Sequence, residues 1–314
     1  AAARLGVPAK ASRMEHGYLP TTVFGVFGAA AASARLMGLD ADRTGHALGL
    51  AYAHACGNRQ ALFDHTLAKR IQPAIAARSG VESAHLAARG VTGAQRVVEG
   101  TAGLFRLYGS DPTRTPDPES VSVDRETWEI ERLSFKSYAC CGASHPLLLA
   151  AIDLAAQHGL CLEDVIEAEI VGVDNPFIGV PWDPSRASQE QAQFCAPYQV
   201  AAAIKYGRLG TAEVDEARIL ADREVSDVAQ RVKIVSGRVA SGEQTLRLRT
   251  RDGRTLTQTR TREDVLAPHV MNDDALLAKF RQNAGDTRLA DAIMAMDATD
   301  LIADLVKEFL HESA

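Results

Sequence analysis

The residues best suited to chemistry are gathered in one segment, 135–146 (FKSYACCGASHP), which runs directly into an apolar stretch, 147–156. Lys136, Ser144 and His145 all stand on this segment, which has the composition of a loop that leads into a helix. A helix N-terminus carries partial positive charge and free N–H groups, which disfavour an imidazolium and can hold a carboxylate. A neutral histidine beside an anion site is what proton abstraction next to a carboxylate requires.

The same residues also have a purely structural interpretation. Ser144 can be only the N-cap of the following helix and Pro146 its first-turn proline, which leaves His145 as a surface residue without a task. Lys136 is more readily interpreted as covering a domain edge than as an anion ligand. The adjacent cysteines at 140 and 141 are interpreted as inert, because nothing in the sequence places a general base beside either thiol.

Composition excludes several classes of protein. With 314 residues the chain can form two domains, and a net charge of -6 without a basic stripe argues against a nucleic-acid partner. No apolar run reaches the roughly 18 to 20 residues of a membrane span. Five cysteines without C-x-x-C spacing predict neither a disulfide framework nor a metal site, which favours a cytoplasmic protein. The chain begins on alanine rather than methionine, so we expect a processed or incomplete chain.

The first third of the sequence predicts helices. Aromatic residues are scarce, at 5%, and alanine is abundant, which indicates close packing through small side chains. Gly38, Gly57 and Gly90 are expected to end helices, and Asp40 to begin one. The predicted helices are 24–37, 40–56, 69–89 and a shorter one over 92–100.

A second type of structure is predicted after residues 109–119, which contain three prolines and form the best domain boundary. Alternating residues and an Asp252-Gly253 turn predict a β-hairpin among other strands. The predicted strands are 166–173, 231–235, 245–250 and 255–260, and the helices among them are 146–158 and 197–206. Pro268 closes this α+β part, and helix is expected again from Asp274.

Four separated segments, in order and with matching spacing, resemble the MmgE/PrpD family, which contains 2-methylcitrate dehydratases, cis-aconitate decarboxylases and iminodisuccinate epimerases. Each segment alone is a weak signal, but four in register cover almost the whole chain. They are GYLPTT at 17–22 with FGAAAA at 27–32; TLAKR at 66–70 with GVESA at 80–84 and GVTG at 90–93; FKSY at 135–138 with SHP at 144–146; and QFCAPY at 193–198.

The resemblance implies a site between a helical domain and an inserted lid. Lys69 matches the family's active-site lysine, and His145 matches the histidine that acts as acid or base. Tyr198 matches a position near the substrate, although it can equally be an amphipathic core residue. Thr21, Ser144 and Lys136 lie in the matching segments and are expected to bind substrate. Family members act on small di- and tricarboxylates, and the resemblance implies neither a metal nor an organic cofactor.

Two departures from the family pattern bear on the activity. The family's helical domain begins more than a hundred residues earlier, in a region that carries an aspartate and a histidine of the site. Decarboxylase-type members have histidine where this chain has Leu19. We therefore expect a lyase (dehydratase or decarboxylase) first; the alternatives are an epimerase or isomerase of a dicarboxylate, and a non-catalytic remnant or one subunit of a split enzyme.

The predicted fold is mainly α with an α+β part: a discontinuous helical domain with an inserted α+β lid. The helical domain is expected over 1–115, the lid over 116–267 and a return to the helical domain over 268–314. We also expect a homodimer through the helical domain, because the alanine-rich helices offer small-residue faces and an incomplete bundle leaves apolar surface to cover.

Overall fold

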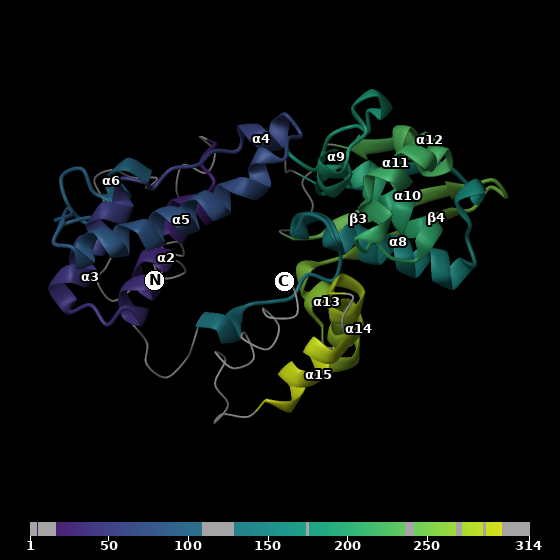
Figure 1. Ribbon diagram of the computed structural model, residues 1–314. Helices are drawn as coiled ribbons and strands as arrows, with labels where there is room; N and C mark the ends of the chain where they lie inside the picture. The colour runs from purple at the N-terminus through teal and green to yellow at the C-terminus, as the bar shows by residue number, and fades with distance from the viewer. Residues whose placement is uncertain are drawn as a thin grey trace. The chain divides into compact units, whose positions relative to one another are not determined.

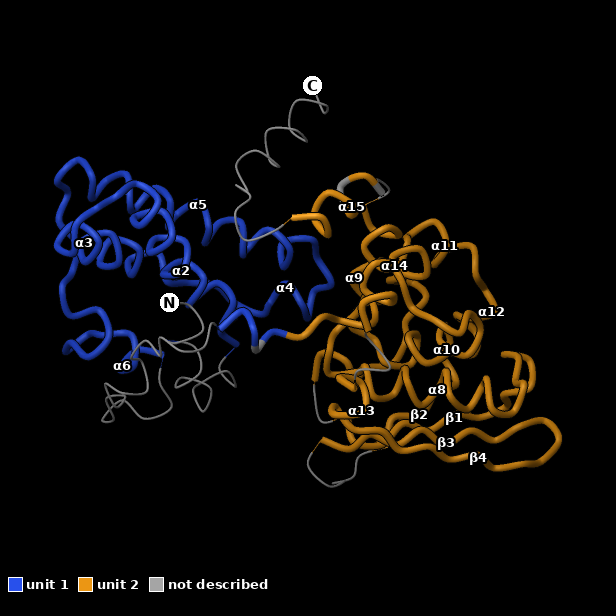
Figure 2. The backbone as a smooth tube through the Cα atoms, turned by 90° about the horizontal axis from the view of Figure 1, so that it is seen from below, with its two compact units in different colours: residues 1–133 blue, residues 134–314 orange. Residues whose placement is uncertain are grey.

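The structure of the chain is a computed structural model that describes residues 5, 17–108, 129–173, 176–235, 242–267, 272–284 and 287–296. The chain forms two compact units, 1–133 and 134–314 (Figure 2). The proline-rich segment 109–119, predicted as the boundary, lies outside the described residues. Helices dominate both units, and the second unit adds a small mixed sheet, so the predicted class, mainly α with an α+β part, is confirmed.

The first unit consists of helices that pack through small residues. The long helices α2 and α3 both lie against α5 (Figure 1). A Cβ atom placed on Gly80 of α5 would lie 2.5 Å from the Ala29 Cβ and 2.7 Å from the Ala30 nitrogen, so the two backbones approach as only glycine allows. The helices are α2 (Pro20–Leu36), α3 (Ala41–Tyr52), α4 (Gln60–Phe63), α5 (Ala68–Ala88) and α6 (Leu104–Tyr108).

Local signals explain where these helices begin and end. Pro20 occupies the first turn of α2, where its missing N–H costs nothing, and Gly38 follows its end with φ +67°. Asp40 caps α3 by accepting a hydrogen bond from the Arg43 amide at 2.8 Å. The predicted helix over 92–100 is wrong: the segment forms loop and turns, and the Gly93 amide donates to His46 Nδ1 on α3.

The second unit is built on a four-stranded sheet with the order β2-β1-β3-β4. Strands β1 and β2 are parallel, whereas β3 is antiparallel to both β1 and β4. Gly253, with φ +86°, makes the tight turn of the β3–β4 hairpin that the sequence predicts. The strands are β1 (Val165–Val171), β2 (Val232–Val235), β3 (Gln244–Thr250) and β4 (Thr255–Arg260), within a few residues of those predicted.

Helices cover one face of this sheet and form the main core with it (Figures 1 and 2). Ile170 of β1 and Leu246 and Leu248 of β3 are fully buried beneath them. The helices of this unit are α8 (His145–His158), α9 (Gln189–Phe194), α10 (Ala196–Tyr206), α11 (Glu216–Ala221), α12 (Arg223–Arg231) and α13 (Arg262–Leu266). Short 3-10 turns occur at Glu129–Arg132, Gly142–Ser144, Leu162–Asp164, Pro184–Arg186 and Ala212–Val214.

The opposite face of the sheet carries a ladder of charges. Glu167 of β1 pairs with Lys233 of β2 and with Arg249 of β3, the latter at 2.8 Å. Glu169 of β1 lies 3.9 Å from Arg247 of β3. Hydrogen bonds from Lys233 and then from Arg249 hold the pKa of Glu167 below its usual range. Each glutamate of β1 is therefore matched by bases on the neighbouring strands.

Two helices end the described chain, α14 (Asp273–Ala284) and α15 (Thr287–Ala295), and they fall within the second unit. Helix α14 reaches the loop before α8, since the Lys279 side chain donates to the backbone carbonyl of Lys136. The return of 268–314 to the helical domain and the lid character of 116–267 stay predictions, because each unit is described by itself.

Candidate functional site

Residues 135–146, called the site segment from here on, are held in place by hydrogen bonds to three separate parts of the second unit: the loop after α10, helix α9 and strand β3. The Ala139 amide donates to the Leu209 carbonyl at 2.8 Å, and the Cys141 amide donates to the Gln193 carbonyl at 3.0 Å. Gln244, at the start of β3, donates to the Ala143 carbonyl at 2.6 Å. The segment then tightens into the Gly142–Ser144 turn and enters α8 at His145, so the histidine occupies the first residue of a fourteen-residue helix.

His145 is buried, with 4% of its surface exposed, and its Nε2 has no hydrogen-bond partner among the described residues. Burial lowers its pKa to about 4, with the positive charges of Lys136 and Lys279 acting in the same direction. Backbone hydrogen bonds with Cys140 and Tyr138 oppose the shift without reversing it. The interpretation of His145 as a surface residue is therefore wrong. Its imidazole is neutral at pH 7 and can accept a proton.

Two lysines place positive charge beside this imidazole. The exposed Lys136 donates from Nζ to the Cys140 carbonyl at 3.0 Å. The half-buried Lys279 comes from α14, more than a hundred residues later, and donates to the Lys136 carbonyl. Burial, and secondarily the charge of Lys136, lowers the pKa of Lys279. Neither ammonium forms an ion pair with a carboxylate in the part of the chain that the structure describes.

Ser144 is fully buried and its hydroxyl is engaged within the protein. Its Oγ lies 2.9 Å from the Cys141 carbonyl oxygen and 2.5 Å from Gln199 Oε1. Gln199 in turn donates to the Ala192 carbonyl at 3.0 Å. The hydroxyl makes no capping bond to α8, so its packing role is to fix the entry to the helix, and its predicted contact with substrate stays a prediction.

Cys140 is an inert neighbour of the site. Burial raises the pKa of its thiol to about 12, so it carries no thiolate at neutral pH. This agrees with the prediction that the thiol has no chemical task.

Tyr198 lies in the core of the second unit rather than at its surface. Only 1% of the residue is exposed, its ring packs against Trp182 with centroids 4.6 Å apart, and its hydroxyl donates to the Glu213 carbonyl at 2.9 Å. Burial raises the pKa of the phenol above its usual range. This placement favours the core interpretation, and the predicted role near the substrate stays a prediction.

The remaining predicted site residues belong to the first unit. Thr21 is exposed in the first turn of α2, and Lys69 is half-buried in the first turn of α5. Leu19, which stands where decarboxylase-type members have histidine, is 8% exposed and donates its amide to the Gly57 carbonyl at 3.2 Å. Lys69 and His145 lie in different units, so their predicted approach across one cleft stays a prediction.

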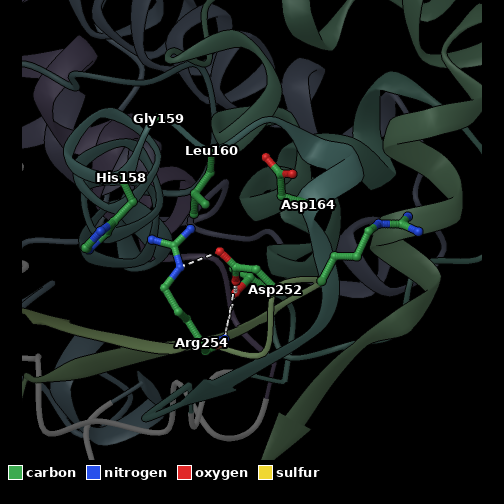
Figure 3. Close-up of a pocket in the computed structure, with 8 residues that line it drawn as sticks. His158, Gly159, Leu160, Asp164, Asp252 and Arg254 are labelled. Atoms are coloured by element: carbon green, nitrogen blue, oxygen red, sulfur yellow. Dashed lines mark hydrogen bonds and ion pairs between the residues drawn. The ribbon is translucent and has the colours of Figure 1, made fainter.

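A cavity of about 280 Å³ lies at the opposite end of α8, where His158 and Gly159 face the β3–β4 turn (Figure 3). Asp252 and Arg254 point toward each other in its lining and form an ion pair at 2.7 Å (Figure 3). The cavity contains none of the residues predicted for the site. The charges of Asp252 and Arg254 in its lining neutralise each other.

Two features are absent from the described ranges. No group of three or more histidine, cysteine, aspartate or glutamate side chains is placed to hold a metal ion there. None of the described helices combines the length and the apolar character needed to cross a membrane.

Comparison with known proteins extends these observations. Residues 1–116 match the family model of the MmgE/PrpD N-terminal domain, and residues 138–298 match that of the MmgE/PrpD C-terminal domain. A cis-aconitate decarboxylase-like protein, oryM, of Aspergillus oryzae is 34% identical over 140 residues, which cover 43% of this chain and 29% of that protein.

Cis-aconitate decarboxylases of Aspergillus terreus and Homo sapiens are also similar. The fungal protein is 32% identical over 136 residues, 42% of this chain and 28% of its own length. The human protein is 25% identical over 218 residues, 67% of this chain and 43% of its own length. In each of these alignments the chain covers less than half of the relative's length.

Proposed function

The chain belongs to the MmgE/PrpD family, and from that premise we propose that it serves an enzyme that removes a proton from the carbon next to a carboxylate of a small di- or tricarboxylate. The reaction proposed first is that of a lyase. In dehydration a base takes the α-proton and an acid protonates the leaving hydroxyl, whereas in decarboxylation the bond to the carboxylate breaks and an acid protonates the carbon that keeps the electron pair. The relatives named cis-aconitate decarboxylase support this choice.

One observation carries the proposal: a buried, neutral imidazole with an unpartnered Nε2 begins α8, beside two ammonium groups. A general base must be deprotonated at the working pH and within reach of the proton it takes. The ammonium groups and the helix N-terminus supply the positive potential that binds a carboxylate and stabilises the charge that develops on it. His145 is assigned the base, and Lys69 is assigned a carboxylate contact or the acid.

Epimerisation is the second candidate, and Leu19 favours it. Elimination needs an acid for the leaving group, whereas epimerisation needs only a base on each face of one carbon. The buried, apolar Leu19 has no proton to donate at a position where decarboxylase-type members have histidine. A non-catalytic remnant and a subunit of a split enzyme are the remaining alternatives, and adding the N-terminal helical segment of a family relative in trans distinguishes them.

The decisive experiment is to incubate the chain with a panel of small polycarboxylates in deuterated water and follow the products by mass spectrometry. Loss of water or carbon dioxide from the substrate identifies a lyase. Uptake of deuterium without loss of either identifies an epimerase. If no member of the panel exchanges or reacts, with or without the N-terminal helical segment of a relative, the proposal fails. Unchanged turnover after dialysis against a chelator is expected, since the proposal needs no metal.

We further propose that the chain forms a homodimer through its helical unit. Helix α5 and the residue before it expose Leu67, Ile71 and Ile75, each four residues from the next and therefore on one face. Static light scattering at micromolar concentration should give twice the mass of the chain, and a monomer would reject the proposal.

A further inference from the structure

Of the two charged groups that act on His145 within the described residues, Lys136 is near it in the sequence and Lys279 is not. It lies on α14, in the C-terminal part of the chain, and packing alone places its ammonium at the carbonyl of Lys136. The residue is half-buried, which restricts the position of its charge more than full exposure would. The contact therefore belongs to the packed structure of the second unit.

Each of the two ammonium groups has unused hydrogen-bond capacity. An ammonium carries three donors. Lys136 uses one on the Cys140 carbonyl, and Lys279 uses one on the Lys136 carbonyl. No carboxylate among the described residues pairs with either. Burial, and secondarily the charge of Lys136, lowers the pKa of Lys279. An anion that bound both would satisfy the remaining donors and relieve the repulsion between them.

A third polar group lies within the influence of the same charges. His145 Nε2 is buried and without a partner in the described part of the chain, and the charges of both lysines act on its ring. Two cations and an unpartnered imidazole nitrogen thus converge at the start of α8. A monocarboxylate offers only one negative charge to this group, whereas a polycarboxylate offers one to each lysine.

We propose that Lys279 is a second substrate-binding cation of the His145 site, and that Lys136 and Lys279 together select anions with two or more carboxylates over monocarboxylates. This inference rests on the proposed function of the same site. It makes α14 part of the site, so the C-terminal helices contribute to substrate selection.

Binding of citrate and of acetate to the whole chain, measured by titration calorimetry, tests this inference. Lys279→Gln keeps an amide that can donate to the Lys136 carbonyl but removes the charge, and it should weaken citrate binding about tenfold or more. Acetate binding should change by less than citrate binding. The matched control is Arg281→Gln, which removes one charge from the exposed side of the same helix, where Arg281 pairs with Asp291 at 3.5 Å. It should leave citrate binding within twofold of the wild type.

A structural role for Lys279 would give a different result. In that case Lys279→Gln would lower the melting temperature and would weaken citrate and acetate binding equally. Lys279→Arg would not restore the preference for citrate. If Lys279→Gln does not fold, NMR of the wild-type chain replaces it. The side-chain signals of Lys279, assigned by their loss in Lys279→Arg, should shift when citrate is added. Unshifted signals, or citrate binding by Lys279→Gln equal to the wild type, would overturn the inference.

The inference and the proposed function fail in distinguishable ways. Citrate binding that depends on Lys279, without turnover of any polycarboxylate, supports the binding site and rejects the enzymatic function. Turnover with a kcat/KM that Lys279→Gln leaves unchanged rejects the role of Lys279 and retains the function. A wild-type chain that binds no citrate overturns the inference directly.

Discussion

The imidazole of His145 lies edge-on to the ring of Tyr138, with ring centroids 5.1 Å apart and planes at 78°. The tyrosine thereby covers the histidine without competing for its Nε2, which keeps the ring dry and neutral. Burial raises the pKa of the Tyr138 phenol to about 12, so this neighbour stays uncharged across the working range of pH.

Replacement of His145 tests the assignment of the general base. His145→Gln should reduce deuterium exchange or turnover about a hundredfold or more, because general-base catalysis contributes about 10² to 10⁴. His158→Gln is the matched control, since it changes an exposed histidine at the other end of the same helix. Equal rates for His145→Gln and the control would reassign His145 to packing.

Stability should depend on pH through His145. Its folded pKa of about 4 lies below the ordinary value of 6.5, so between these values the unfolded chain binds a proton that the folded chain does not. Stability from this group is complete above pH 6.5 and is lost as pH falls toward 4, by about 3 kcal/mol at most. Denaturant titrations at pH 7, 5.5 and 4.5 should show this loss in the wild type and not in His145→Gln. Parallel pH curves for the two proteins would contradict the burial argument.

Lys69 should matter for turnover and not for folding. If its ammonium contacts a substrate carboxylate in a partly dry cleft, Lys69→Ala should lower kcat/KM thirtyfold or more, from a contact worth ~2 to 5 kcal/mol. Alanine is tolerated in the first turn of α5, so the melting temperature should stay near that of the wild type. Arg70→Ala, one residue along the same helix, is the control. Full activity of Lys69→Ala would end the assignment.

Tyr198 should behave as a structural residue. Tyr198→Phe removes the hydrogen bond to the Glu213 carbonyl and should lower the free energy of unfolding by about 1 kcal/mol. We expect kcat and KM to stay unchanged, because the hydroxyl is satisfied inside the core. A raised KM at unchanged stability would instead place Tyr198 at the substrate, as the resemblance implies.

Much of the fold is predictable because its signals are local. The Asp252-Gly253 turn, the cap at Asp40 and the stop at Gly38 each act within a few residues, and the corresponding elements are confirmed. The helix predicted over 92–100 is wrong, and the start of that segment instead makes a long-range contact, from the Gly93 amide to His46.

The site is less predictable than the fold, because its charges come from packing. The sequence correctly indicates a neutral His145, but it attributes the neutrality to the helix N-terminus, whereas burial is the largest cause. Lys279 carries no local signal at all. It is one lysine on a helix with no buried residues of its own, and only the packing of α14 brings it to the Lys136 carbonyl.

The parallel pairing of β1 with β2 has a consequence for how the second unit assembles. Ala168 of β1 lies opposite Val232, 64 positions later, and opposite Leu248 of β3, 80 positions later. Until those strands arrive β1 is an unpaired apolar strand, which is a template for association between chains. Glu167 and Glu169 are expected to repel a second copy of the unpaired strand, because the described bases that neutralise them come from β2 and β3.

The two glutamates of β1 are therefore expected to prevent association between chains during folding, and to contribute little to the stability of the folded chain. Replacing both by threonine should change the melting temperature little, because surface ion pairs contribute little to stability. It should lower the yield of refolding from denaturant as the protein concentration rises, measured by light scattering during dilution. A refolding yield equal to that of the wild type at every concentration would show that β1 is shielded in another way.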